Sequence, residues 1–132
     1  MNMNKALAAI VLTLASSSAV LAEETPVEAW YAALQDVDRG TFERIIDNDG
    51  RIILKELQVI QNKEEFIESL DNWEEAAKDL KLFFSADRKG ENEIVTQVCY
   101  QFESNAFTNL ETFTFDNDKI VLQVQEKLRD GC

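Results

Sequence analysis

Carboxylates dominate the side chains of this sequence that could take part in chemistry. The chain has 25 Asp and Glu against 13 Lys and Arg, and it has no His. Without His, the Ser–His and Cys–His nucleophile arrangements cannot form, and the commonest zinc ligand is missing. A glycine-rich phosphate-binding loop is also absent from the sequence. These classes of active site are therefore excluded.

Two acidic segments have part of the spacing of a calcium loop. In the first, Asp47–Gly50 is followed by Glu56 at the twelfth position, but the first ligand position is Ile45, which has no side-chain oxygen. In the second, Asp116–Asp118 is followed by Ile120 where a third ligand belongs. We expect both segments to be turns, whose chemistry favours Asp, Asn and Gly, and we expect no metal site.

The N-terminal segment has the order of a secretory signal. Lys5 precedes an apolar run, Ala6–Ala15, and a small-residue exit follows with Val20 and Ala22 at the positions that a signal peptidase reads. A retained membrane anchor is the alternative, but the run has half of the roughly 20 apolar residues that a spanning helix needs. We predict a cleaved signal over residues 1–22, a cut between Ala22 and Glu23, and a periplasmic or secreted protein.

The two cysteines, Cys99 and Cys132, are interpreted in the light of export. An oxidising compartment favours disulfides, and the pair lacks the C-x-x-C spacing of a redox-active motif. We expect one structural disulfide that ties the C-terminal residue to a strand. Two free thiols, or a bond from Cys132 to another chain, are the alternatives.

Composition limits the partners and the number of domains. The net charge of −12 repels phosphate backbones and anionic lipid surfaces, so we expect neither nucleic acid nor membrane as a partner. An apolar content of 45% argues against disorder. One Pro and four Gly leave no room for long flexible linkers. Residues 23–132 are therefore predicted to be a single domain.

Helical signals fill the first half of that domain. Thr25, Pro26 and Glu28 form a capping box with Pro at the first helical position, and a second, short helix is predicted over Thr41–Ile46. After a turn at Asp47–Gly50 come predicted strands at 51–55 and 57–60. Asn62 and Glu65 then start a long amphipathic helix, whose apolar side is formed by Phe66, Leu70, Trp73 and Ala77.

From Leu80 the apolar period changes from 3.6 to 2. Ile94, Thr96, Val98, Tyr100 and Phe102 are predicted to share one face of a strand, and turns at 88–90, 104–105 and 116–118 separate it from its neighbours. Successive hairpins make an antiparallel meander. Helices first and strands last predict an α+β domain, with N-terminal helices packed on a curved, mainly antiparallel sheet.

This order of elements resembles the nuclear transport factor 2-like superfamily, and most closely its SnoaL-like and ketosteroid-isomerase-like members. The resemblance covers about Pro26 to Leu128, and it is carried by Val27–Leu34, Asp38, Phe42–Ile46, Asn62–Phe66 and Phe113–Ile120. It implies a cone-shaped domain whose sheet curls around a pocket. The superfamily includes isomerases, cyclases, hydrolases and non-catalytic binders, so the fold alone does not imply an activity.

The resemblance also points to three site residues. Tyr31 falls where such proteins carry a functional Tyr, and Glu111 falls where an isomerase places the acid that holds the oxyanion. Lys55 falls where the carboxylate base belongs, and an ammonium is the wrong group to accept that proton at neutral pH. Lys55 and Glu111 could instead form an ion pair across the pocket mouth. We therefore name no catalytic residue.

Three aromatic residues, Trp30, Trp73 and Tyr100, are pocket-lining candidates on the family analogy, although ordinary core packing is the better explanation for each of them alone, and for Tyr31. We predict a non-catalytic domain, without a cofactor, that binds a small, partly apolar molecule in its cone. The first alternative is an isomerase- or cyclase-type enzyme that uses Tyr31 and Glu111 with an unidentified base. The second is a homodimeric module that pairs through a sheet face carrying Val95, Gln97 and Gln101.

Overall fold

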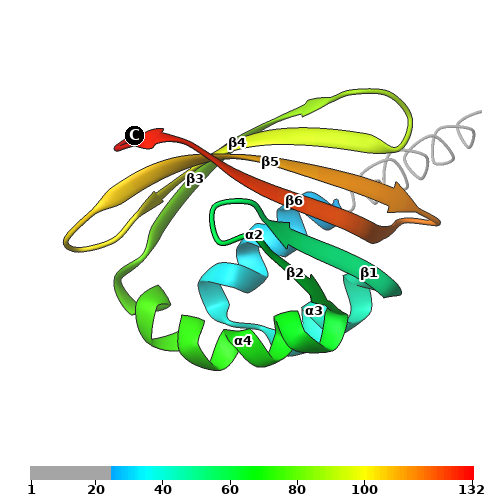
Figure 1. The fold of residues 1–132 in the computed structure, drawn as a ribbon, viewed down its shortest axis with the longest axis horizontal. Coiled ribbons are helices and arrows are strands. Elements are labelled where there is room, and N and C mark those ends of the chain that lie inside the picture. The colour runs from blue at the N-terminus through cyan, green and yellow to red at the C-terminus, as the bar shows by residue number, and fades with distance from the viewer. Residues whose placement is uncertain (1–24) are drawn as a thin grey trace, which may run out of the picture.

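The computed structural model describes residues 25–132, so the predicted signal and the predicted cut between Ala22 and Glu23 lie outside the described residues. The described chain forms one six-stranded sheet in the order β2-β1-β6-β5-β4-β3, which arches over helices on one side (Figure 1). The predicted α+β class, with helices on a curved, mainly antiparallel sheet, is confirmed. No helix within residues 25–132 is long and apolar enough to cross a membrane. In chain order the elements are α2 (Pro26–Asp36), α3 (Arg39–Ile45), β1 (Ile46–Leu54), β2 (Val59–Asn62), α4 (Lys63–Ala76), the 3-10 turn η2 (Ala77–Asp79), β3 (Lys81–Arg88), β4 (Glu93–Gln101), β5 (Ala106–Asp116) and β6 (Lys119–Asp130).

The two predicted capping boxes start α2 and α4. Thr25 Oγ1 accepts a hydrogen bond from Glu28 N at 3.1 Å, and Glu28 Oε1 accepts one from Thr25 N at 3.2 Å. At α4, Asn62 Oδ1 accepts from Glu65 N at 2.8 Å, and Glu65 Oε1 accepts from Asn62 N at 2.9 Å. Each box satisfies amide groups that the first helical turn leaves unpaired. Both helix starts are therefore confirmed.

The second helix, α3, begins two residues earlier than predicted. The carboxylate of Asp38 accepts hydrogen bonds from Thr41 N at 3.2 Å and from Thr41 Oγ1 at 2.7 Å. Asp38 is therefore the N-cap, and Arg39 and Gly40 form the first turn. A carboxylate at this position also interacts favourably with the positive end of the helix dipole.

The turn predicted at Asp47–Gly50 is wrong, because these residues belong to β1. The local turn chemistry is present, since Asp49 N donates to Asp47 Oδ2 at 2.9 Å. It produces an irregularity in the pairing of β1 with β6, between Ile46 and Arg51, rather than a reversal of the chain. Gly50 allows this close packing, because a Cβ there would lie 2.9 Å from Ile46 Cγ2 and 3.0 Å from Ile120 O. The segment is thus a bulged strand.

The remaining strands follow the predicted meander with shifted bounds. β3, β4, β5 and β6 pair antiparallel in succession, while β1 pairs with β6 in parallel and with β2 antiparallel. The predicted strand at 57–60 is displaced to Val59–Asn62, since residues 55–58 form a turn in which Gln58 has a φ of 54°. The parallel pair was not predicted.

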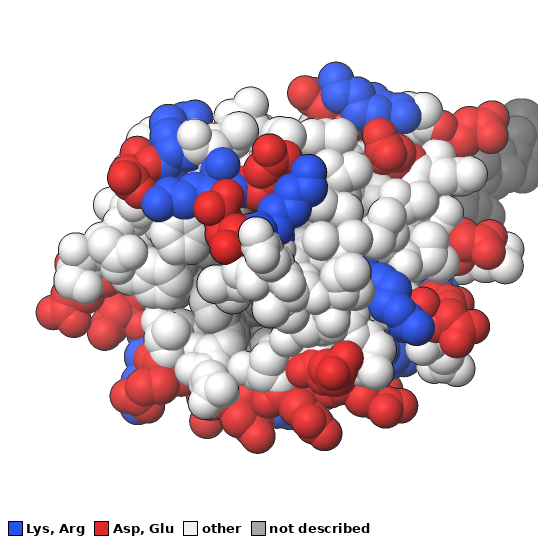
Figure 2. Space-filling view, viewed as in Figure 1, with Lys and Arg blue, Asp and Glu red and all other residues white. Residues whose placement is uncertain are grey.

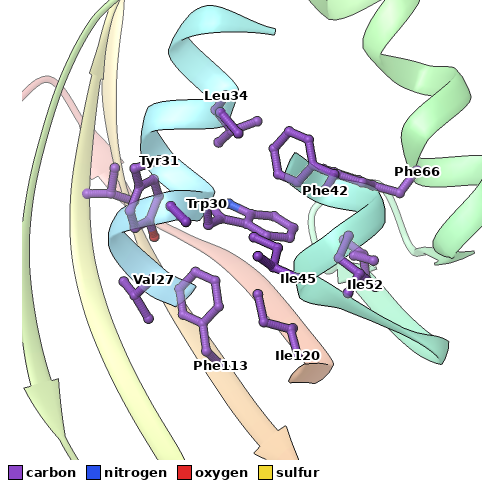
Figure 3. Close-up of a cluster of buried hydrophobic side chains, with 14 of the residues drawn as sticks. Val27, Trp30, Tyr31, Leu34, Phe42, Ile45, Ile52, Phe66, Phe113 and Ile120 are labelled. Atoms are coloured by element: carbon purple, nitrogen blue, oxygen red, sulfur yellow. The ribbon is translucent and has the colours of Figure 1, made fainter. Parts of the chain in front are cut away.

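An aromatic cluster fills the space between the helices and the sheet (Figure 3). Trp30 of α2 is fully buried at its centre. Its ring stacks on Phe66 with centroids 5.0 Å apart, and it meets Phe42 and Phe113 edge-on at 5.0 and 5.5 Å. Within residues 25–132, Trp30 Nε1 is the one fully buried side-chain nitrogen or oxygen without a hydrogen-bond partner. Trp30 is therefore part of the core, and it lines neither of the cavities described below.

Cys99 of β4 and Cys132 are joined by a disulfide, which closes a segment with a sequence separation of 33 residues. Gly131 continues the strand pairing next to this bond, because its N donates to Ala106 O at 2.8 Å. The bond thus holds the end of the chain against the centre of the meander.

The double variant Cys99→Ser/Cys132→Ser should lose about 3–4 kcal/mol of unfolding free energy, because an uncrosslinked unfolded chain has more conformational entropy. Urea unfolding of both proteins measures this difference. A reductant should destabilise the wild type and leave the double variant unchanged. Detection of two thiols per chain in unfolded, unreduced wild-type protein would contradict the bond.

Candidate functional site

A cavity of about 170 Å³ lies between the helical layer and the inward face of the sheet, and we call it the inner cavity. Its walls are mainly apolar and aromatic, with three amide side chains and two hydroxyl-bearing side chains, Ser69 and Tyr100, among them. A void of about 150 Å³ with apolar walls is large enough to hold a benzene ring. The lining residues are Leu34, Leu54, Gln61, Phe66, Ser69, Leu70, Trp73, Tyr100, Phe107, Asn109 and Gln125.

A second cavity of about 330 Å³, the outer cavity, adjoins the first. The two share Leu54, Phe107, Asn109 and Gln125, and the outer cavity adds Lys55, Glu56, Leu57 and Lys127. It is therefore the wider and more charged part of one recess. The mouth is nearly balanced in charge, because Lys55 Nζ pairs with Glu126 Oε2 at 3.5 Å and Lys127 Nζ pairs with Asp130 Oδ1.

The exposed face of α4 is strongly acidic. Figure 2 shows Asp and Glu gathered along the lower rim of the molecule, where α4 lies in Figure 1, below an uncharged area. The same helix lines the inner cavity with its opposite face through Phe66, Ser69, Leu70 and Trp73. One side of the recess is thus bordered by a helix rich in carboxylates, three of which pair with Arg39 or Lys78. The exposed acids of α4 are Glu64, Glu65, Glu68, Asp71, Glu74 and Glu75.

Beneath the floor of the inner cavity, Glu111 of β5 is completely buried. Its Oε1 accepts hydrogen bonds from Tyr31 Oη at 2.7 Å and from Gln123 Nε2 at 3.2 Å. Its Oε2 accepts from Tyr100 Oη at 2.8 Å and from Asn109 Nδ2 at 2.9 Å. Four donors from α2, β4, β5 and β6 thus surround one carboxyl group, and we call this set the Glu111 network.

Strand alternation brings these residues together. Along β5, Asn109, Glu111 and Phe113 are buried, while Leu110, Thr112 and Thr114 between and beyond them are only half-buried. On β6, Gln123 pairs with Phe113 and Gln125 pairs with Glu111. Successive side chains of a strand point to opposite faces, so the polar members of both strands meet on the inward face.

Two further contacts extend the Glu111 network. Thr96 Oγ1 lies 2.6 Å from Tyr31 Oη and 3.2 Å from the main-chain oxygen of Glu111. Gln125 Nε2 donates to Gln123 Oε1 at 2.9 Å. A chain of side-chain hydrogen bonds therefore runs from Glu111 through Gln123 to Gln125, which lines both cavities.

Burial sets the protonation of the network. It raises the pKa of Glu111, and the hydrogen bonds from Asn109, Tyr31, Tyr100 and Gln123 oppose that rise. The pKa values of Tyr31 and Tyr100 are also raised, first by burial and then by the negative charge of Glu111. Both phenols therefore keep their protons at neutral pH and act as hydrogen-bond donors, not as bases.

The structure separates the residues that the resemblance had placed in one pocket. Tyr31 and Glu111 are 2% and 0% exposed, and neither lines the inner or the outer cavity. Lys55 lies in the turn after β1 and lines the outer cavity. The suggested ion pair between Lys55 and Glu111 is wrong, because Lys55 pairs with Glu126 and Glu111 is enclosed by uncharged donors.

The two aromatic candidates Trp73 and Tyr100 both line the inner cavity. Trp73 Nε1 donates to the main-chain oxygen of Leu34 at 2.8 Å, which fixes the indole. Its ring meets that of Tyr100 edge-on, with centroids 6.3 Å apart. An aromatic corner is thus held in place by α2, α4 and β4.

Sequence reasoning missed the amide side chains, Asn109, Gln123 and Gln125, and also Phe107. The alternation of β5 contained a usable signal, because counting back two residues from Glu111 gives Asn109 on the same face. Gln123 and Gln125 share a face in the same way. Within residues 25–132, no group of three or more Cys, Asp or Glu side chains is placed to hold a metal ion.

Replacement of Glu111 by Gln should change how stability depends on pH. A carboxyl whose pKa is raised by folding binds its proton more tightly in the folded chain, so its contribution to stability falls as pH rises from the unfolded value of 4.5 to the raised value. The unfolding free energy of the wild type, relative to Glu111→Gln, should fall over this range by up to about 1.4 kcal/mol per pH unit and then level off.

Urea unfolding of both proteins at a series of pH values from 4 to 8 gives this difference. Glu103→Gln, which removes one exposed carboxylate between β4 and β5, controls for the loss of a negative charge. A difference between wild type and Glu111→Gln that does not vary with pH would show that Glu111 titrates alike in the folded and unfolded chain.

Comparison with known proteins gives the fold a place among solved structures. A structure from Burkholderia xenovorans, described as an NTF-2-like protein of unknown function, superposes with a TM-score of 0.63 at 17% identity over 79% of this chain and 80% of that one. A protein of ketosteroid isomerase-like fold from Catenulispora acidiphila, in complex with trimethylamine, superposes with a TM-score of 0.64 at 13% identity, over 76% of this chain and 82% of that one. An LEH-like epoxide hydrolase of M. tuberculosis superposes with a TM-score of 0.56 at 16% identity, over 76% of this chain and 74% of that one.

By sequence, the chain matches no family model and no curated protein. The structural likenesses have low identity, so they show the fold and leave the activity open. They agree with the architecture described above, in which helices cover one face of a curved sheet. The chain therefore has the fold of the nuclear transport factor 2-like superfamily.

Proposed function

We propose that this domain, after export to an oxidising compartment, binds a small and mainly apolar molecule in the inner cavity. The observation that carries the proposal is the composition of that cavity. Leu34, Leu54, Phe66, Leu70 and Phe107 supply apolar walls, and the three amide side chains converge from the sheet. Mainly apolar walls with a small number of placed polar groups are typical of small-molecule sites.

Two further points support binding rather than catalysis of the isomerase type. Tyr31 and Glu111, the pair needed to hold an oxyanion, are enclosed in the Glu111 network and do not line the cavity. Their donors and acceptors are already paired with one another. The relative from Catenulispora acidiphila holds trimethylamine, which supports a small-molecule role for this type of recess.

Export and the disulfide support one another. The bond between Cys99 and Cys132 is stable in an oxidising compartment such as the periplasm. The predicted signal over residues 1–22 would take the chain there. Mass spectrometry of the exported protein tests this part, with Glu23 expected at the N-terminus; retention of Met1 on exported protein would contradict it.

Toluene serves as a probe of the inner cavity, because it has the size of one aromatic ring. At ten times its dissociation constant, binding should stabilise the protein by about 1.4 kcal/mol, which is a rise of roughly 5 °C or more in the unfolding temperature of a domain of this size. Ser69→Phe should abolish the effect, since Ser69 lines the cavity and a phenyl ring there would fill it.

Asn72→Phe is the matched control, because Asn72 is an exposed residue of α4 that does not line the cavity. It should keep the stabilisation by toluene. Equal stabilisation of wild type and Ser69→Phe would place the probe elsewhere and contradict the proposed site. No stabilisation of the wild type by toluene would contradict the proposal of an apolar site itself.

A second role, homodimerisation through the sheet, is supported by the character of its outward face. The burial pattern of β4 turns Val95, Gln97 and Cys99 away from the helices. Strand pairing places Thr112, Leu110 and Thr108 beside them, and further outward positions hold Thr114, Leu122 and Val124. These positions are uncharged in a chain with a net charge of −12. Charged strand partners border them, with Asp87 beside Val95, Glu126 beside Leu110 and Arg129 beside Thr108. Depletion of charge is typical of interface cores.

Val95→Asp should therefore convert a dimer to a monomer, because it would place two carboxylates in a desolvated interface. Light scattering coupled to gel filtration measures the mass of each species. Ala32→Asp is the matched control, since Ala32 is exposed on α2, on the helical side. A wild type that is monomeric at all concentrations would contradict this second role and leave the cavity proposal intact.

A further inference from the structure

The Glu111 network fixes which atoms the sheet presents to the inner cavity. In its ionised form, above its raised pKa, Glu111 can only accept hydrogen bonds, so its Oε2 holds the Nδ2 end of Asn109 toward itself at 2.9 Å. The carbonyl end of the same amide, Oδ1, is then turned the other way. Asn109 lines both cavities, and within residues 25–132 its Oδ1 accepts no hydrogen bond.

The same reasoning passes along the second arm of the network. Glu111 Oε1 accepts from Gln123 Nε2 at 3.2 Å, which leaves Gln123 Oε1 to accept from Gln125 Nε2 at 2.9 Å. Gln125 therefore has its carbonyl oxygen free of any partner in the described part of the chain, and it lines both cavities as well. Each amide in this chain has its orientation set by the one before it.

We infer that the inner cavity selects a ligand bearing N–H donors on a small apolar body, an amine being the simplest, because Glu111 orients Asn109 and Gln125 with their carbonyl oxygens toward it. This inference rests on the proposed binding function and names the chemical class of its ligand. Tyr100 offers the cavity no competing donor, since its hydroxyl group already donates a hydrogen bond to Glu111 Oε2.

Two surroundings of the cavity favour the same class. The rings of Trp73, Tyr100 and Phe107 line it, and aromatic faces attract the partial or full positive charge of an amine. The acidic face of α4 raises the local concentration of cations near the recess. Gln61 of β2 also lines the cavity, and no member of the Glu111 network holds its amide, so either end can turn inward and Gln61 does not discriminate.

Glu111→Gln should reverse part of this selection. The new amide must donate from one of its two terminal positions. If its NH₂ group takes the place of Glu111 Oε1, Tyr31 Oη accepts from it. The O–H of Tyr31 then donates a hydrogen bond to Thr96 Oγ1, at 2.6 Å. Gln123 must then turn over to accept, and Gln125 turns over with it, so that its NH₂ group faces the cavity. If it donates at the second position, Asn109 turns over instead, and Tyr100 must also accept, which frees its own O–H to donate elsewhere. In either case, one carbonyl oxygen that faced the cavity is replaced there by an NH₂ group, which is a donor.

Three ring compounds of similar size provide the test. Toluene has no polar group, aniline adds N–H donors, and benzonitrile adds an acceptor only. In the wild type, aniline should bind about fivefold more tightly than toluene, the worth of one net hydrogen bond, and more tightly than benzonitrile. In Glu111→Gln the ratio of aniline affinity to benzonitrile affinity should fall at least about fivefold. Titrations followed by amide NMR shifts measure all three affinities.

A ratio that is the same in wild type and Glu111→Gln would overturn the inference, although toluene binding would still uphold the proposed function. Failure of all three compounds to bind would overturn both. Should Glu111→Gln not fold, Gln125→Met serves instead, because it removes one carbonyl oxygen that faces the cavity and leaves Glu111 in place. Aniline affinity should then fall about fivefold while toluene affinity is unchanged; an unchanged aniline affinity would overturn the inference.

Discussion

A carboxyl group buried without a cation is the constraint around which this domain is built. Glu111 is fully buried among uncharged side chains, and an unpaired charge in such a place costs several kcal/mol unless hydrogen bonds replace its water. Four donors do so, from α2, β4, β5 and β6. Glu111 therefore links the first helix to three adjacent strands. Because a donor lost from the network leaves its partner unsatisfied, at a cost of about 1–3 kcal/mol, the network ties the helix to one position on the sheet.

Much of the fold could be predicted because its signals are local. The capping residues around Thr25 and Asn62 satisfy amides within one helical turn, so the sequence shows them directly. The alternation of Ile94, Thr96, Val98 and Tyr100 reports one inward face, and these residues are buried. The disulfide between Cys99 and Cys132 was expected from the two cysteines and the predicted export to an oxidising compartment.

The errors come from features that depend on distant parts of the chain. Asp47–Gly50 has the composition of a turn, but β6 runs beside it and pairs with it, so the segment stays extended as a bulged strand. Glu111 was assigned to the pocket by counting along a homologous pattern, and counting does not reveal that Tyr31, Tyr100 and Asn109 close over it. The suggested partner, Lys55, lies in the turn after β1 and is half-exposed there, at 53% of its side chain.

The same pair of residues can serve two purposes, and burial decides between them. A Tyr and a carboxylic acid that face a cavity can stabilise a developing negative charge on a substrate. When they face each other, as Tyr31 and Glu111 do at 2.7 Å, their hydrogen bonds are consumed within the protein. What reaches the cavity wall is then the arrangement that they impose on their neighbours. An amide has a donor end and an acceptor end. Because Glu111 in the core fixes the donor end, the acceptor end is fixed at the cavity wall, two residues away along β5 and at Gln125 on β6. The chemistry of the cavity is thus determined by a group that does not line it.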